Sequence, residues 1–259
     1  MNTIASRYQL QIETLTPLHI GDGREFLLDV DFVRSDGATY VLNLDRFATW
    51  AYERDSSTRW MAQKPGQILA GHHNDLEAAR LYDYKLGGVP VNNRLRSFVK
   101  TVYAEPYLPG SSIKGMLRTI FIWGLYAARN RKPDLTRLSK NRSWAGQSVE
   151  RDVMGLNPNL DLFRALHVND SAPLGLEALR VRSVDIYPTG RGRNQGVVVD
   201  IESLREGSVT SSALTIESFG FGPLAADELG WKGKDRWLTP ENLVMLGKAF
   251  AEQRLHQEV

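Results

Sequence analysis

The segment from Pro106 to Tyr126 constrains the fold of this chain most strongly. Pro109 and Gly110 hold the backbone out of a helix, and Ser111 or Ser112 is expected to cap the helix that follows. Apolar residues then occupy most sides of that helix, at Met116, Leu117, Ile120, Phe121, Trp123 and Leu125. A helix that is apolar on most sides must be buried, so we expect it to pack against a sheet.

Several segments carry strand patterns that supply such a sheet. Residues 8–14 alternate strictly between apolar and polar, which indicates a strand with one buried face. Residues 26–34 and 39–44 flank an Asp-Gly pair at 36–37 that is typical of a tight hairpin. Further strands are expected at 165–169, 179–187, 197–204 and 209–218. Strands mixed with helices predict the α+β class.

The helices outside this central segment have weaker signals. Asp45 is expected to cap a short helix that runs to Arg54, and residues 74–85 have the apolar side of a second helix. Residues 55–73 between them are polar and weakly patterned, so we expect a mobile loop or an insertion there. Pro240 is expected at the first position of a last helix.

Composition excludes several classes of protein. The chain has 259 residues, of which 42% are hydrophobic, and this supports a packed core. It has no cysteine, which excludes disulfides, thiolate nucleophiles, Cys-ligated zinc and iron–sulfur clusters. No apolar stretch reaches the roughly 20 residues that a membrane helix needs. We therefore expect a soluble, cytoplasmic protein.

The net charge of +2 is unevenly distributed along the chain. Residues 85–142 contain twelve Lys and Arg but only two acidic residues, so this segment carries +10 and the remainder carries −8. Such asymmetry is typical of proteins that bind a polyanion. A solvated basic face would give the same pattern, and charge alone leaves both interpretations open.

Residues 110–114 invite comparison with a phosphate-binding loop. A Walker A sequence has a second glycine directly before its lysine, whereas Ile113 precedes Lys114, so we exclude a nucleoside triphosphatase of that kind. A Gly-Ser-Ser turn at a helix start still presents free N–H groups to an anion. Lys114 and Arg118 lie on one face of this helix and are expected to contact phosphate. The alternative is a capped core helix with two solvated cations.

The histidines and a pair of aspartates give weak signals for catalysis or metal binding. His19 lies beside a glycine turn and is interpreted as holding that loop, because no second acid/base partner is evident. His72 and His73 are adjacent and point apart on any regular element. Asp29 and Asp31 share one side of an expected strand but are explained equally well as its polar face. We expect no catalytic residue, metal or cofactor.

A second basic element lies later in the chain. Arg180, Arg182, Arg191 and Arg193 bracket a glycine-rich loop that has Tyr187 beside it. Guanidinium groups, flexible glycines and an aromatic ring suit single-stranded RNA. A surface loop with solubilising charge explains the same residues, and both interpretations stay open.

Three segments together resemble a known family. Thr16–Gly23 (TPLHIGDG), Tyr107–Arg118 (YLPGSSIKGMLR) and Val168–Pro173 (VNDSAP) are similar to motifs of the RAMP proteins of type III CRISPR effector complexes. Their order, the hairpin at 26–47 and the segment 199–209 are most similar to the fifth subunit of the Csm (type III-A) complex.

This resemblance implies a fold and a role. The fold would be a single ferredoxin-like, RNA-recognition-type RAMP domain over residues 1–259, with an inserted helical and loop segment at 45–95. Relatives usually continue into another strand, so the last strand is expected to be missing. The role would be to bind the 3′ end of the crRNA, cap the filament of backbone RAMP subunits and aid crRNA maturation without cleaving RNA. The partners would be the crRNA, the backbone RAMP subunit and the small subunit.

The resemblance also implies site residues and two alternative activities. Together with the second basic element, the positions expected to contact RNA are His19, Gly21, Arg24, Gly110, Ser111, Ser112, Lys114, Arg118, Arg182, Arg191 and Arg193. One alternative is a metal-independent endoribonuclease that uses His19 to process guide RNA. The other is a backbone subunit that cleaves target RNA with a loop aspartate such as Asp22 or Asp29.

Overall fold

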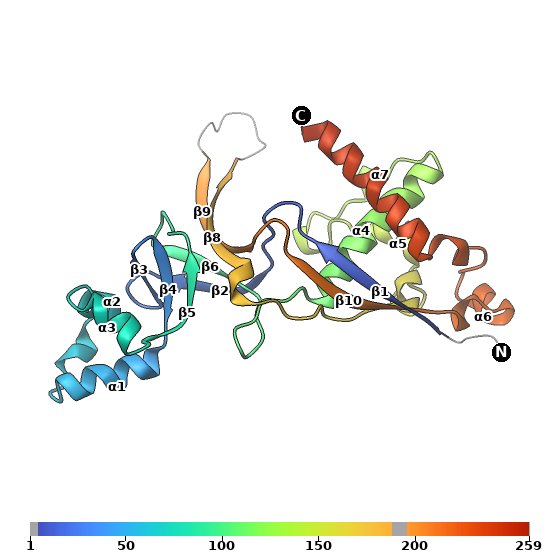
Figure 1. The fold of residues 1–259 in the computed structure, drawn as a ribbon. Helices are drawn as coiled ribbons and strands as arrows, with labels where there is room; N and C mark the ends of the chain where they lie inside the picture. Colours follow the sequence, from blue (N-terminus) through green and yellow to red (C-terminus); the bar gives the residue numbers. More distant parts are fainter. Residues whose placement is uncertain (1–4, 188–195, 259) are drawn as a thin grey trace. The chain divides into compact units, whose positions relative to one another are not determined.

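A computed structural model describes residues 5–187 and 196–258 (Figure 1). The chain divides into two compact units. The first, called the helical unit below, consists of Met1–Gln11, Pro109–Ser171 and Ser211–Val259. The second, called the sheet unit, consists of Ile12–Leu108 and Ala172–Thr210. Each unit is described by itself.

The helical unit is built on most of a three-stranded sheet with the order β1-β10-β7. Its strands are β1 (Ala5–Glu13), β7 (Leu166–Val168) and β10 (Val209–Glu217). Its helices are α4 (Gly110–Ala128), α5 (Gln147–Met154), α6 (Pro223–Glu228) and α7 (Pro240–Glu258). Helix α4 contacts α7, and the two helices lie close to each other in Figure 1.

Helix α4 confirms the strongest prediction from the sequence. It runs from Gly110 to Ala128 and contacts strand β7, and Phe121 and Leu125 are buried in the core of the unit. The predicted serine cap is wrong, because Pro109 holds the cap position and Ser111 and Ser112 already lie within the helix. Pro109 has an extended backbone (φ −60°, ψ 133°), and its own side chain makes no capping hydrogen bond.

The sheet unit contains a seven-stranded sheet with the order β2-β6-β9-β8-β5-β4-β3. Its strands are β2 (Gly21–Leu27), β3 (Phe32–Ser35), β4 (Ala38–Leu42), β5 (Tyr82–Gly87), β6 (Arg94–Phe98), β8 (Leu179–Ile186) and β9 (Val197–Leu204). Strands β8 and β9 pair antiparallel from Leu179 opposite Leu204 to Ile186 opposite Val197. The strands expected at 179–187 and 197–204 are therefore confirmed.

Three helices lie between β4 and β5. They are α1 (Leu44–Arg54), α2 (Pro65–Leu69) and α3 (His73–Ala78), and Trp50, Leu69 and Leu76 anchor them in a core with Tyr40 of β4. Helix α1 is confirmed, but its cap is Asn43, whose side chain accepts from the Arg46 N–H, and not Asp45. Of the two alternatives expected at 55–73, the loop is wrong, because a 3₁₀ helix at Arg59–Ala62 and α2 form there, and the insertion stays a prediction.

Two other local predictions are wrong. The helix expected at 74–85 ends at Ala78, Arg80 takes a left-handed φ of 48°, and β5 then pairs with β4. The strand expected at 26–34 is split, because Asp29 takes a φ of 66° in a turn between β2 and β3. The hairpin at Asp36 and Gly37 is confirmed by φ values of 50° and 73°.

The α+β class is confirmed. The single domain over 1–259 and the insertion at 45–95 stay predictions. Across residues 5–187 and 196–258, no helix is both long and apolar enough to cross a membrane.

Candidate nucleic-acid interface

The start of helix α4 is joined to the Asn-Asp motif near residue 170. The N–H of Gly110 donates to Asp170 Oδ1 at 2.7 Å, and a Cβ at position 110 would lie 2.2 Å from the carbonyl oxygen of Val168. Two of the three motifs behind the family resemblance therefore meet here. Only glycine fits this approach, and the Asp170 carboxylate already occupies the anion position at this N–H.

Lys114 and Arg118 line one cavity of about 450 Å³, as their spacing predicts. Lys114 Nζ donates to the carbonyl of Leu166 at 2.7 Å, and burial lowers the pKa of Lys114. Arg118 forms a bidentate pair with Asp161 at 3.0 and 2.6 Å and donates from Nε to Glu150 at 2.8 Å.

These internal partners decide what Arg118 can offer a ligand. Burial lowers the pKa of Arg118, but the hydrogen bonds that Arg118 donates to Asp161 and Glu150 outweigh burial and raise its pKa overall. The positive charge of Arg118 is therefore largely balanced by these two carboxylates within the unit. Arg151 and Arg164 also line the cavity, so four cations face two carboxylates there, and the cavity keeps a positive balance toward an anion.

The loop of the first motif lies in the sheet unit. His19 Nδ1 lies 2.7 Å from the carbonyl oxygen of Glu202, so the ring donates from Nδ1 and its Nε2 is the accepting nitrogen. The ring also packs edge-on against Phe98. A Cβ at Gly21 would lie 3.1 Å from His19 Nε2. Among the described residues no carboxylate hydrogen-bonds to His19, and this geometry is that of a loop-holding histidine.

Arg24 lies on strand β2 and pairs with Asp22. Its Nε donates to Asp22 Oδ2 at 2.7 Å, and its backbone N–H donates to Asp22 Oδ1 at 2.9 Å. Burial is the largest single influence on Asp22 and acts to raise its pKa. The hydrogen bonds from Arg24 together outweigh burial and lower the pKa of Asp22. The Arg24 side chain stays 65% exposed and is therefore available to a ligand.

The second basic element is only partly within the described residues. Arg180 and Arg182 both donate to the carboxylate of Glu206, at 2.5 and 2.8 Å. The buried Nε of each arginine has no hydrogen-bond partner within the described ranges. One carboxylate thus neutralises half of this charge. Arg191 and Arg193 lie outside the described residues.

The basic segment 85–142 is distributed over both units, and many of its cations are paired. Lys85 pairs with Glu77, Arg94 with Glu25, Lys100 with Glu202, Arg118 with Glu150 and Asp161, and Arg137 with Asp152. Arg129, Arg131 and Lys132 follow the end of α4, are exposed and form no ion pair within the described part of the chain. These three residues, called the α4 basic patch below, belong to the basic segment identified in the sequence but were not among the positions expected to contact RNA. Their density of charge at 129–132 was the available signal.

A buried polar network was also missed. Glu202 accepts from the Tyr84 hydroxyl at 2.8 Å, from the Phe98 N–H at 2.7 Å and from Lys100 Nζ. Burial lowers the pKa of Lys100 and outweighs the opposing effect of Glu202. Burial, followed by the Glu202 charge, raises the pKa of Tyr84. The sequence signal was an acidic residue within the apolar run VVVDIESL.

Comparison with known sequences gives consistent relatives. The family model of the RAMP superfamily matches residues 11–239. The protein "CRISPR system Cms protein Csm5" of Mycobacterium tuberculosis (strain CDC 1551 / Oshkosh) is 24% identical over 288 residues, which cover 92% of this chain and 72% of the relative. The Csm5 protein of Streptococcus thermophilus is 24% identical over 191 residues, or 64% of this chain and 52% of that relative.

Solved structures show the same fold. The crystal structure of T. onnurineus Csm5 matches with a TM-score of 0.73 and 21% identity, covering 96% of this chain and 80% of that chain. A chain in the cryo-EM structure of a Csm-crRNA-target RNA ternary complex of a type III-A CRISPR-Cas system matches with a TM-score of 0.69 and 21% identity, covering 96% and 76%. The match over residues 11–239 shows that this chain belongs to the RAMP superfamily, with a sequence and fold similar to those of Csm5.

Proposed function

We propose that this chain is a Csm5-like subunit of a type III-A CRISPR effector complex that binds the guide RNA without cleaving it. The observation that carries the proposal is the match, over 96% of the chain, to a chain of a Csm-crRNA-target RNA complex. The finer role follows the family: the chain binds the 3′ end of the crRNA, caps the filament of backbone subunits and aids crRNA maturation. Its partners are the crRNA, the backbone RAMP subunit and the small subunit.

The charges of the described residues support RNA as the ligand. The α4 basic patch offers three exposed cations that form no ion pair with any residue the structure describes, and the cavity at Lys114 has a surplus of positive charge. Phosphate contacts of this kind give affinity that falls with salt and tolerates sequence. We also propose that the domain is ferredoxin-like, which the packing of α4 against β7, a strand paired antiparallel with β10, supports.

The surroundings of His19 support a binding role over a catalytic one. A general base must reach the proton it removes and usually has an orienting partner. His19 donates from Nδ1 to the Glu202 carbonyl, which orients its ring, but among the described residues no carboxylate hydrogen-bonds to His19 as a second acid/base group. Asp22 is held by Arg24 and Ser97, which leaves it poorly placed as a second catalytic group.

One experiment tests the subunit role and one tests catalysis. Affinity purification of the full chain from its host, with sequencing of bound RNA, is expected to recover crRNA and one copy of this chain per effector complex. Random cellular RNA, or many copies per complex, would contradict the proposal. A repeat-derived RNA is expected to stay intact in EDTA. Cleavage that disappears in His19→Ala would establish the endoribonuclease instead.

A further inference from the structure

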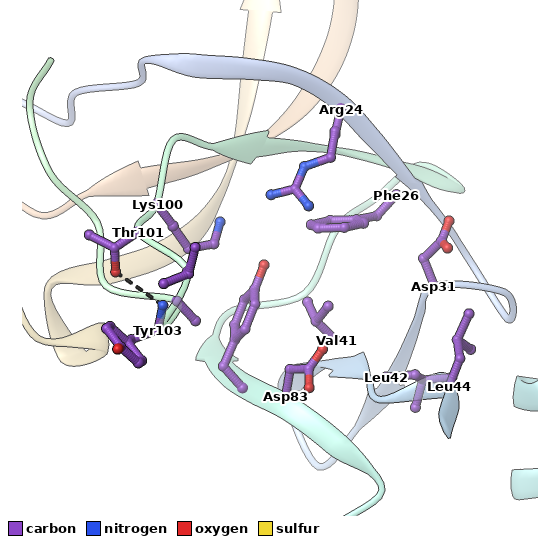
Figure 2. A pocket seen from close by; sticks show the side chains of 13 residues that line it. Arg24, Phe26, Asp31, Val41, Leu42, Leu44, Asp83, Lys100, Thr101 and Tyr103 are labelled. Carbon is purple, nitrogen blue, oxygen red and sulfur yellow. Dashed lines mark hydrogen bonds between the residues drawn. The ribbon is translucent and has the colours of Figure 1, made fainter. Parts of the chain in front are cut away.

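The sheet unit contains a cavity of about 610 Å³ that no motif of the chain explains. Figure 2 shows Arg24 and Phe26 along one edge of this cavity and Lys100, Thr101 and Tyr103 at another. Asp31 and Asp83 also line it. The volume is in the range of ligand pockets, roughly 300 to 1,000 Å³. Its lining combines aromatic rings, cations and carboxylates, which is unusual for a gap left by imperfect packing.

The floor of the cavity is fixed by the buried network at Glu202. Tyr84 and Lys100 line the cavity, and both are tied to the same carboxylate. The Lys100 side chain is only 3% exposed and its charge is matched by Glu202. The floor is therefore rigid and close to neutral, so the cavity is preorganised without being a strong anion site.

A tight turn presents an aromatic ring at the rim. The Thr101 N–H donates to the Glu105 carbonyl at 2.8 Å, and the Ala104 N–H donates to the Thr101 carbonyl at 3.0 Å. Ala104 takes a strained φ of 63° within this turn. The turn leaves Tyr103 81% exposed. A rigid backbone that holds a tyrosine in water favours stacking against a ligand with its own π-face.

Two carboxylates at the opposite wall have acceptor positions to spare. Asp31 Oδ2 accepts from the Leu27 N–H at 2.8 Å, and Asp83 Oδ1 accepts from the Asn43 side chain at 2.6 Å. Within the described ranges, nothing donates to the second oxygen of either carboxylate. A carboxylate oxygen only accepts, so these positions select ligands with N–H groups. Cytosine, adenine and guanine carry an exocyclic amino group, whereas uracil has one N–H between two carbonyls.

We propose that this cavity holds one unstacked nucleobase of the bound RNA, with its ring on Tyr103 and its amino group at Asp83. Arg24, whose side chain is 65% exposed and lines the cavity, contacts the adjoining phosphate. The inference rests on the proposed function, because it takes single-stranded RNA as the ligand. It adds a base preference to a subunit otherwise expected to bind sequence-tolerantly.

The test compares two fluorescein-labelled RNA probes with the full chain. One is an oligouridine, and the other is the same oligouridine with a single central cytidine. Anisotropy titration is expected to show about fivefold tighter binding of the cytidine probe. Asp83→Asn should remove that preference. Tyr103→Ala should weaken both probes by about fivefold or more, and Tyr103→Phe should keep wild-type binding.

Tyr52→Ala is the matched control, because Tyr52 is 55% exposed on α1 and does not line the cavity. Both Tyr103 and Tyr52 are exposed, so neither change is expected to disturb folding. RNA that binds without preference, and equally to Tyr103→Ala and wild type, would overturn the inference and leave the proposed function standing. Failure of the wild type to bind either probe would overturn both.

Discussion

The ammonium group of Lys100 donates to the carboxylate of Glu202 in the interior of the sheet unit, where the two side chains are 3% and 0% exposed. These residues are 102 positions apart and lie at the end of β6 and on β9. Glu202 also accepts from Tyr84 and from the Phe98 N–H. A buried charge pair is tolerated only when its remaining lone pairs are satisfied, which this network achieves.

Removal of one partner should cost far more than removal of both. Lys100→Met leaves a buried, unbalanced carboxylate and is expected to lower the free energy of unfolding by about 3–5 kcal/mol. Lys100→Met with Glu202→Gln should recover most of this loss, because Gln still accepts a hydrogen bond. Urea unfolding measures both. The control, Lys85→Met, removes an exposed ion pair and should have a much smaller effect on the free energy of unfolding. A double variant as unstable as the single one would contradict this explanation.

Two glycines of helix α4 should respond in opposite directions to alanine. At Gly110 the new Cβ would meet the Val168 carbonyl at 2.2 Å, so Gly110→Ala is expected to destabilise by about 1–3 kcal/mol. At Gly115 nothing lies within 4 Å, so Gly115→Ala should stabilise the helix by about 0.5–1 kcal/mol. Thermal unfolding compares the pair. Equal effects would show that helix propensity, and not the close approach, decides the outcome.

Glu77 should make stability depend on pH in the acidic range. It accepts hydrogen bonds from Tyr40 at 2.7 Å, Lys85 at 2.9 Å and Tyr82 at 2.8 Å, which lower its pKa to about 2. A lowered carboxylate pKa stabilises the fold above the unfolded value of 4.5, and this contribution is lost as the pH falls toward 2.

The unfolding midpoint of Glu77→Gln should therefore lie below that of the wild type at pH 7. The difference between the unfolding midpoints of the wild type and the variant should become smaller as the pH falls from 4.5 to about 2. Glu53→Gln, an exposed change on α1, is the control and should show no such narrowing. A gap that stays constant from pH 7 to pH 2 would exclude a role for the Glu77 charge.

Local patterns predicted the elements whose causes are local. The apolar run after Gly110 produced α4, and the Asp-Gly pair at 36–37 produced a hairpin. The helix predicted at 74–85 was wrong over its second half, because there the helical pattern competes with the pairing of β5 with β4, a contact with distant residues. The turn at Asp29 was missed for a similar reason. Gly66 of α2, which is distant in the sequence, donates its N–H to the Asp29 carbonyl.

The sequence predicted which residues belong to the site but not which partners their side chains have. The sequence identified Lys114 and Arg118 as neighbours on one face, and both line one cavity. It could not show that Asp161 and Glu150 neutralise Arg118, because those partners are 43 and 32 residues away. The same limit hid the link between Lys100 and Glu202. A count of charges along a chain therefore overstates the charge that a ligand meets.

The α4 basic patch should carry the salt-dependent part of RNA binding. Arg129, Arg131 and Lys132 are exposed and unpaired within the described residues, whereas most other cations of the basic segment are paired. Lys234 adds a fourth cation nearby, since burial and then the positive charge of Arg129 lower its pKa. A cluster of cations that is not balanced by nearby carboxylates attracts a phosphate group.

The triple variant with alanine at Arg129, Arg131 and Lys132 should bind single-stranded RNA more weakly than the wild type. The slope of log affinity against log salt concentration should fall by about 2, because each lost phosphate contact contributes roughly 0.7. Filter binding over a salt series measures this slope. The matched control removes three paired cations of the same segment, Lys85, Arg94 and Arg137, and should change the slope much less because their charges are already neutralised. Equal losses in the two triple variants would mean that net charge, and not the patch, governs binding.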